Sequence, residues 1–165
     1  MRLLDWLSRR PRPQPSLGVA AIALAAPQLP AKHVLARQLR EAQPLLPPLR
    51  DAETQGDMLS FTLGDARVSL ALLRTPLPSR QRERLQVRTE RAVELLERHT
   101  AHVFVTVRAV VAEPSRVELL LRSIVGAVAA LSPACGVCWG EAPTFYRPEE
   151  FLAVGPEAPR SSMTA

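Results

Sequence analysis

Two cysteines and two histidines have spacings that could support metal or redox chemistry. Cys135 and Cys138 form a C-x-x-C pair and His99 and His102 form an H-x-x-H pair, together enough ligands for one tetrahedral zinc ion. Residues 136–139 are expected to form a strand, however, and a strand points alternate side chains to opposite faces instead of forming a zinc knuckle. No helix is expected to follow Cys135 and activate its thiol as in redox dithiols. We therefore expect two buried, unreactive thiols, no metal and no cofactor, with a zinc-binding protein or enzyme as the alternative.

The histidines have structural interpretations of their own. His99 is expected to end a helix, where its side chain meets the negative end of the helix dipole. His102 is expected to begin a strand as a packed, hydrogen-bonded residue. The sequence also has no nucleophile elbow, phosphate-binding loop, dinucleotide fingerprint, H-E-x-x-H motif or calcium loop. We therefore predict no catalytic residues and a protein that is not an enzyme.

Four arginines have spacings of four, four and three residues, which would align them on one face of a helix. They are Arg80, Arg84, Arg88 and Arg91. Like charges at this spacing repel each other unless neighbouring glutamates or a partner compensate. We interpret the four arginines as a binding site for an acidic protein partner; the alternative is an ordinary solvated helix face.

The elements that would position these residues follow from hydropathy and turn signals. The hairpin is the clearest, because 58–63 and 67–73 alternate apolar and polar residues around the two-residue turn Gly64-Asp65. The stretch 103–111 is apolar on both faces and predicts a central strand. In full, strands are expected at 18–25, 58–63, 67–73, 103–110 and 136–139, and helices at 30–43, 79–98, 115–131 and 148–152, with a polar loop between the first helix and residue 57.

This order of elements predicts an α+β fold in one domain. The first six elements match the split βαββαβ of ferredoxin-like folds, with one αβ unit appended and the helices packed on a mixed sheet. The domain is expected to span 17–153, after an N-terminal segment and Pro/Arg linker at 1–16 and before a disordered tail at 154–165.

Composition indicates partners and compartment. Of the 21 basic residues among 165, only Lys32 is a lysine, and a net charge of +5 is spread among glutamates with few aromatics. This arginine bias is typical of a GC-rich bacterial genome, and the pattern favours a protein partner over nucleic acid. Arg9-Arg10 before the apolar run 17–26 has a superficial likeness to a twin-arginine signal. The run is too short to span a membrane, so we expect a cytoplasmic protein without a membrane partner.

One stretch resembles a known family. His102-Val-Phe-Val-Thr-Val107, a following apolar helix and Gly136-Val-Cys-Trp-Gly140 are similar to an uncharacterised bacterial domain family of unknown function. Its members carry an Ala-His-hydrophobic-Val-Thr-Val strand, an apolar helix and a Gly-Val-aromatic-Trp-Gly strand. The specific part of the resemblance covers about forty residues, and Cys138 stands where the family usually has an aromatic residue. It implies a bacterial origin and supports the architecture, but no activity.

Together these features predict a non-enzymatic bacterial protein-binding module. An immunity or adaptor protein that works beside a secreted toxin or a secretion system is the sharpest form of this prediction. A structural subunit that uses Met1–Leu7 as a docking peptide is a further alternative, beside the zinc-binding protein or enzyme.

Overall fold

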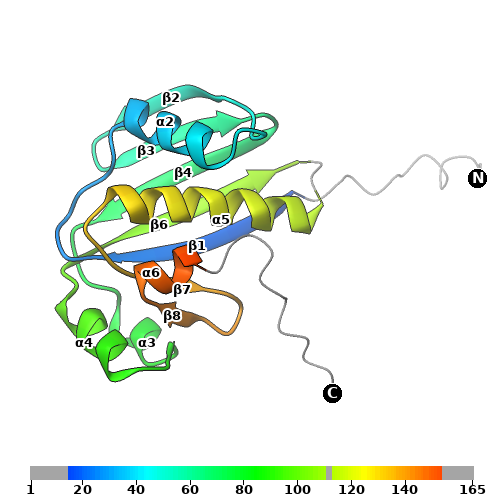
Figure 1. The fold of residues 1–165 in the computed structure, drawn as a ribbon. Coiled ribbons are helices and arrows are strands. Elements are labelled where there is room, and N and C mark those ends of the chain that lie inside the picture. The colour runs from blue at the N-terminus through cyan, green and yellow to red at the C-terminus, as the bar shows by residue number, and fades with distance from the viewer. Residues whose placement is uncertain (1–14, 111–112, 154–165) are drawn as a thin grey trace, which may run out of the picture.

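The computed structural model describes residues 15–110 and 113–153, in which helices pack on an eight-stranded sheet (Figure 1). The strand order is β2-β3-β4-β6-β1-β7-β8-β5. The strands are β1 (Ser16–Leu24), β2 (Leu49–Gln55), β3 (Met58–Leu63), β4 (Ala66–Leu73), β5 (Gln86–Val87), β6 (Ala101–Ala109), β7 (Ala134–Trp139) and β8 (Thr144–Tyr146). The helices are α2 (Lys32–Ala42), α3 (Ser79–Arg82), α4 (Glu90–Arg98), α5 (Pro114–Leu131) and α6 (Pro148–Ala153).

The sheet is mixed, as predicted, because one pair of strands differs from the rest. Short β5 runs parallel to β8, whereas every other neighbouring pair is antiparallel. The predicted hairpin is confirmed: β3 pairs with β4 through a turn in which Gly64 has a φ of 61°. That left-handed conformation favours glycine, which explains the sharp turn at this position.

The centre of the sheet differs from the predicted assignment of strands. The expected split βαββαβ used 58–63, 67–73 and 103–110 with the first strand, which would place β4 next to β1. In the structure β6 lies between β4 and β1, and β1 lies between β6 and β7. The unit α5–β7 is therefore part of the central sheet and is not appended to it. The predicted assignment fails because β3 belongs with β2 to an extension of the sheet beyond β4.

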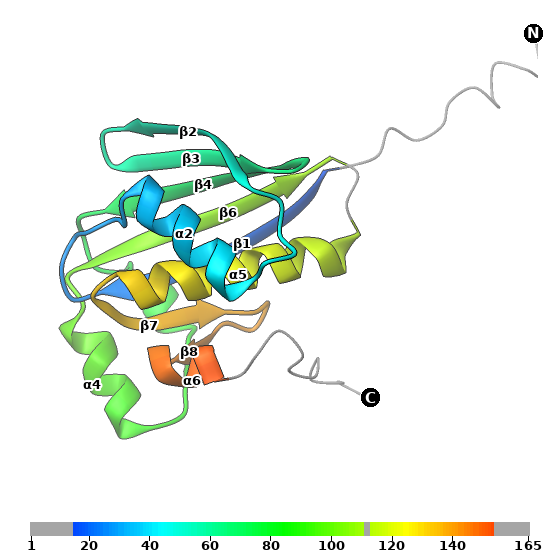
Figure 2. The same ribbon diagram turned by 45° about the horizontal axis from the view of Figure 1, so that its top comes forward.

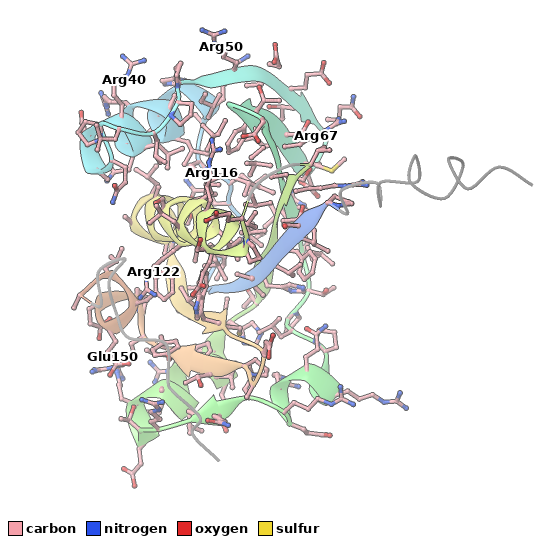
Figure 3. The ribbon with its side chains drawn as sticks, turned by 90° about the vertical axis from the view of Figure 1, so that its right-hand side faces the viewer. Arg40, Arg50, Arg67, Arg116, Arg122 and Glu150 are labelled. Atoms are coloured by element: carbon pink, nitrogen blue, oxygen red, sulfur yellow. The ribbon has the colours of Figure 1, made fainter. Side chains whose placement is uncertain are left out.

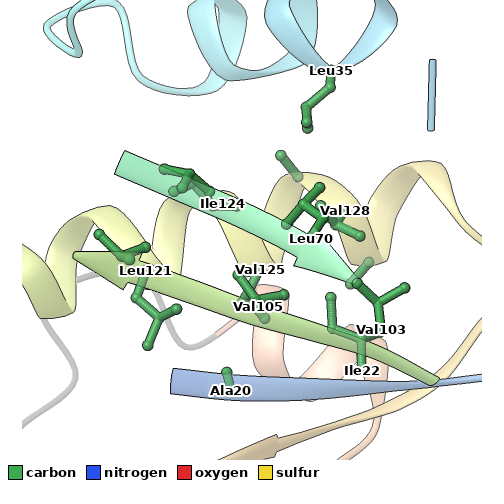
Figure 4. Packing of buried hydrophobic residues seen from close by; sticks show 14 of the residues in the cluster. Ala20, Ile22, Leu35, Leu70, Val103, Val105, Leu121, Ile124, Val125 and Val128 are labelled. Carbon is green, nitrogen blue, oxygen red and sulfur yellow. The ribbon is translucent and has the colours of Figure 1, made fainter. Parts of the chain in front are cut away.

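One face of the sheet is covered by helices. In Figures 1 and 2, α2 and α5 lie side by side against it, and the side view in Figure 3 places both on the same side of the strands. The main core fills this layer with aliphatic side chains from both sides, including fully buried Ile22 and Val105 from the strands and Ile124 from α5 (Figure 4). Aromatic residues are few in this chain, and branched aliphatic residues do most of the packing.

The predicted long helix at 79–98 is not one helix. Residues 79–82 form α3, 86–87 form β5 at the far edge of the sheet, and α4 begins after Thr89. Thr89 is the N-cap of α4, since its hydroxyl oxygen accepts a hydrogen bond from the amide of Ala92 at 3.2 Å. The helix is broken because Gln86 and Val87 pair with β8 instead of continuing the turn.

The segment expected to be a loop up to residue 57 contains strand β2, which pairs with β3 at the edge of the sheet. The expectations for residues 1–14, for the Arg9-Arg10 signal, for Met1–Leu7 and for the tail from Val154 lie outside the described residues. In the part of the chain that the structure describes, no helix is both long and apolar enough to cross a membrane.

Candidate binding surface

The second face of the sheet is covered only in part, and we call its uncovered area the open face. It is formed by the outward-facing residues of β1, β6, β4, β3 and β2, whose register places them in rows across the strands. One row is Leu17, Arg108, Arg67, Thr62 and Arg50; the next is Val19, Thr106, Ser69, Ser60 and Glu53; the third is Phe104, Ala71, Met58 and Gln55, with buried Ala21 at its β1 end. The first row thus carries three arginines, the second carries three hydroxyl groups and the third is mainly apolar, while β1 contributes an apolar residue to each row.

Apolar side chains are exposed on the open face. Leu17 is 64% exposed, Val19 is 42% exposed and Phe104 is 38% exposed. Val19 and Phe104 belong to neighbouring antiparallel strands, where the register places Val19 opposite Thr106, two residues from Phe104. Scattered apolar residues are normal on protein surfaces, but a contiguous exposed group indicates a contact site.

Two arginines on the open face lie directly opposite each other, and we call them the arginine pair. Arg67 of β4 is the register partner of Arg108 of β6, and both side chains are exposed. Figure 3 shows Arg67 extending from the sheet on the side away from α2 and α5. Neither arginine has an ion-pair partner among residues 15–110 and 113–153. Like charges at directly opposite positions destabilise a sheet, so this arrangement is costly for the fold.

Acidic groups on the open face lie toward the edge strand. Glu53 and Arg67 line the same shallow depression, together with Ser60 and Ser69, without forming an ion pair. Asp51 accepts a hydrogen bond from the Thr62 hydroxyl, with 3.0 Å between the oxygens. The positive charge of the open face is therefore concentrated over β4 and β6.

The two predicted histidines define the border of the open face. The imidazole of His102 donates from Nδ1 to the carbonyl oxygen of Thr75 at 2.8 Å. The imidazole of His99 donates from Nδ1 to the carbonyl oxygen of Leu96 and accepts at Nε2 from the amide of Leu77 at 2.7 Å. Both histidines thus hold the segment that leads from β4 to α3, and burial lowers the pKa of His99 below its ordinary value.

A small second core covers the remainder of this face, below α4. Both cysteines belong to it, together with Ala23, Leu96 and Phe145. The predicted alternation would have separated the cysteines, but β7 shifts register against β1 between Ala23 and Leu24, which brings both thiols to one side. Burial raises the pKa of both thiols, that of Cys138 to about 12. Both thiols are free and buried, as expected for unreactive cysteines.

The histidines and cysteines do not assemble into a metal site. Across the described ranges no three His, Cys, Asp or Glu residues are grouped so that they could hold a metal ion. Both ring nitrogens of His99 already have backbone partners. The alternative that all four residues ligate one zinc ion therefore does not fit this geometry.

The four predicted arginines do not share one helix face. Arg80 lies on α3, Arg84 follows it, Arg88 follows β5 and Arg91 lies on α4. All four are exposed, but Arg91 pairs with Glu94 at 2.7 Å and the guanidinium of Arg88 lies 5.9 Å from the centroid of the Tyr146 ring. Arg80, Arg84 and Arg88 have no ion-pair partner in the described part of the chain, and of these three only Arg80 and Arg84 also lack a contact with an aromatic ring.

Comparison with protein-family models, curated proteins and solved structures finds no match to this chain. The resemblance to the uncharacterised bacterial family therefore stays a prediction, and the function has to be argued from the geometry of the surface.

Proposed function

We propose that this chain is a non-enzymatic protein-binding module that contacts its partner through the open face. The observation that carries the proposal is the exposed apolar group of Leu17, Val19 and Phe104 on an otherwise complete sheet. Sheets in small domains bury their apolar faces against a second layer. A partner that covers the open face would supply the layer that the described part of this chain does not.

The interior of the molecule supports this proposal over an enzymatic function. The histidines are engaged with backbone groups, and the thiols are buried with raised pKa values. Two depressions on the described residues lie on the open face and are lined by serines, a threonine and charged groups, together with Gln55, Met58 and Phe61. None of these arrangements pairs a nucleophile with a base.

We include two finer assignments in the proposal. The central order β4-β6-β1-β7, with α2 and α5 on one face, matches the strand order of a ferredoxin-like fold in which β2–β3 and β8–β5 are extensions. Two free thiols in a chain with no other cysteine fit a reducing compartment such as a bacterial cytoplasm. An immunity or adaptor role remains our prediction for the biological context, and a toxin gene beside this gene would support it.

Photo-crosslinking tests the proposed function. A benzophenone amino acid is placed at Thr106, in the middle of the open face, and as a control at exposed Leu119 on α5. In cells that carry the gene, we expect one defined partner to be crosslinked from position 106 and not from 119. The adduct should disappear when Val19→Asp puts a charge beside it. Equal adducts from both positions, or none from position 106, would refute the proposal.

A further inference from the structure

The arginine pair has no ion-pair partner among the described residues, and the apolar residues beside it do not explain why two like charges face each other there. Arg67 and Arg108 face each other across β4 and β6 with no ion-pair partner among the described residues, whereas four other arginines of the described chain pair with carboxylates at 2.6–3.2 Å. These are Arg74 with Asp57, Arg91 with Glu94, Arg116 with Asp65, and Arg147 with Glu149 and Glu150. A facing pair of like charges without ion-pair partners, on a surface that also exposes apolar groups, indicates a bound group of opposite charge.

We propose that the partner covers the open face with an acidic amphipathic helix, whose carboxylates bind Arg67 and Arg108 and whose apolar side contacts Phe104 and Val19. This inference rests on the proposed function and adds the chemistry of the partner. Guanidinium groups bind carboxylates through two parallel hydrogen bonds, which gives such a contact direction as well as strength.

The shape of the open face favours a helix over an added strand. The edge strand β2 is interrupted by a register shift between Arg50 and Glu53, where Asp51 has a φ of 51°. Bulges and charged residues at an edge discourage pairing with a further strand. The opposite face of the same sheet is already covered by helices (Figure 2). Five strands at about 4.8 Å spacing offer a width of roughly 20 Å, which accommodates a helix of about 12 residues.

Other occupants fit the charge less well. The chain's own N-terminal segment carries Arg2, Arg9, Arg10 and Arg12 against a single Asp5, so it would bring positive charge to the arginine pair. A second copy would bring another arginine pair. Single-stranded nucleic acid is anionic but usually stacks its bases on several aromatic side chains, and Phe104 is the one exposed aromatic residue in the three rows of the open face.

A defined probe separates these possibilities. The full isotope-labelled chain is titrated with a 14-residue capped peptide of Leu, Ala and Glu that is amphipathic as a helix, and with a neutral twin in which Gln replaces Glu. We expect the acidic peptide to bind at least about tenfold more tightly than its twin, with amide shifts confined to β1, β4 and β6. The difference should shrink in 0.5 M salt because the contacts are partly screened.

Matched variants identify the groups responsible. Arg67→Gln/Arg108→Gln should lower the affinity for the acidic peptide to that for the neutral twin. The control Arg80→Gln/Arg84→Gln removes two exposed, unpaired arginines elsewhere and should change the affinity less than twofold. Loss of binding in the control instead would assign the acidic partner to Arg80 and Arg84 and overturn the inference.

The remaining outcomes keep the inference and the proposed function apart. Equal binding of both peptides, abolished by Phe104→Asp, would retain a protein-binding open face and refute the acidic helix. Binding of a thymidine dodecamer but not of either peptide would assign the surface to nucleic acid. A dimer of the free chain that Phe104→Asp dissociates would assign it to a second copy. If Phe104→Asp changes the amide chemical shifts of the N-terminal segment in the free chain, the open face would be assigned to that segment. Absence of peptide binding at millimolar concentration would refute the helix, while crosslinking at position 106 still decides the function.

Discussion

The two faces of the sheet are made by the same strands but have opposite chemistry. Along β6, Val103, Val105 and Val107 are fully buried under α5, whereas Phe104 and Arg108, which alternate with them, are exposed. Because side chains alternate along a strand, a single sequence specifies both surfaces at once. On the covered face, branched aliphatic residues pack in close contact and stabilise the fold. The open face instead exposes apolar groups and places two arginines opposite each other, both of which are unfavourable for the fold. Such departures concentrate at functional sites.

The largest expected contrast is between two residues of β1. Ile22 is fully buried in the main core and Val19, three residues earlier, is 42% exposed on the open face. We expect Ile22→Ala to lower the free energy of unfolding by about 2–5 kcal/mol, because it removes buried methyl groups and leaves a cavity. Val19→Ala should change it by no more than about 0.5 kcal/mol. Urea denaturation followed by circular dichroism measures both, and similar losses would mean that the open face is part of a core.

A second contrast concerns the border where the open face gives way to the small core. A Cβ atom on Gly136 would lie 2.2 Å from Cζ of Phe145, so Gly136→Ala should destabilise the protein by about 1–3 kcal/mol through overpacking. Gly126 lies within α5 and has only Leu152 near its Cβ position, at 3.6 Å. Gly126→Ala should therefore stabilise the protein, by about 0.5–1 kcal/mol, through its helix propensity. Thermal unfolding of both variants checks whether the signs are opposite.

The histidine at this border predicts how stability depends on pH. Burial lowers the pKa of His99 in the folded protein below 6.5, so the unfolded chain binds the proton more readily. The stability that neutral His99 contributes to the folded protein is complete above pH 6.5, and it is lost as the pH falls toward the lower pKa of the folded state. Protonation at Nε2 would also remove the acceptor for the amide of Leu77. Urea midpoints between pH 7.5 and 5.0 should fall more for the native protein than for His99→Gln, and parallel curves would contradict this role.

The sequence predicted the elements of the covered face better than the surface. The hairpin 58–73 and the helix 114–131 were recognisable because alternation, the Gly64 turn and the helical repeat act locally. Strand β2 was missed because Leu49–Gln55 is mostly polar, as an edge strand can be. Strand β5 was missed because two residues carry no periodicity, although Thr89 was a visible capping signal for a new helix.

The candidate site was predictable only in part. An acidic partner was predicted from the helical spacing of Arg80, Arg84, Arg88 and Arg91, whose common face depended on an unbroken helix. The stretch from 103 was interpreted as apolar on both sides, although Phe104, Thr106 and Arg108 alternate with three valines and indicate one outer face. The pairing of Arg67 with Arg108 depends on contact between two residues that are 41 positions apart in the sequence, which no local pattern specifies.

The smallest expected effect is the change in stability caused by Arg67→Glu. It tests the open face most directly, because a substitution of a surface arginine is expected here to stabilise the protein. Arg67→Glu would place a carboxylate opposite Arg108 in the cross-strand position, replacing a repulsive pair with an attractive one. We expect the free energy of unfolding to rise by about 0.2–1 kcal/mol, which would raise Tm by up to about 4 °C in a chain of this size. The gain in stability should decrease in 1 M salt. The control Arg84→Glu should show no gain, because no arginine lies opposite residue 84 in the described sheet.

An Arg67→Glu variant that is more stable yet no longer binds the acidic peptide would show that the arginine pair is kept for binding at a cost to the fold. If Arg67→Glu instead lowers Tm, the guanidinium of Arg67 stabilises the folded chain by itself, and its position opposite Arg108 ceases to be evidence for a partner.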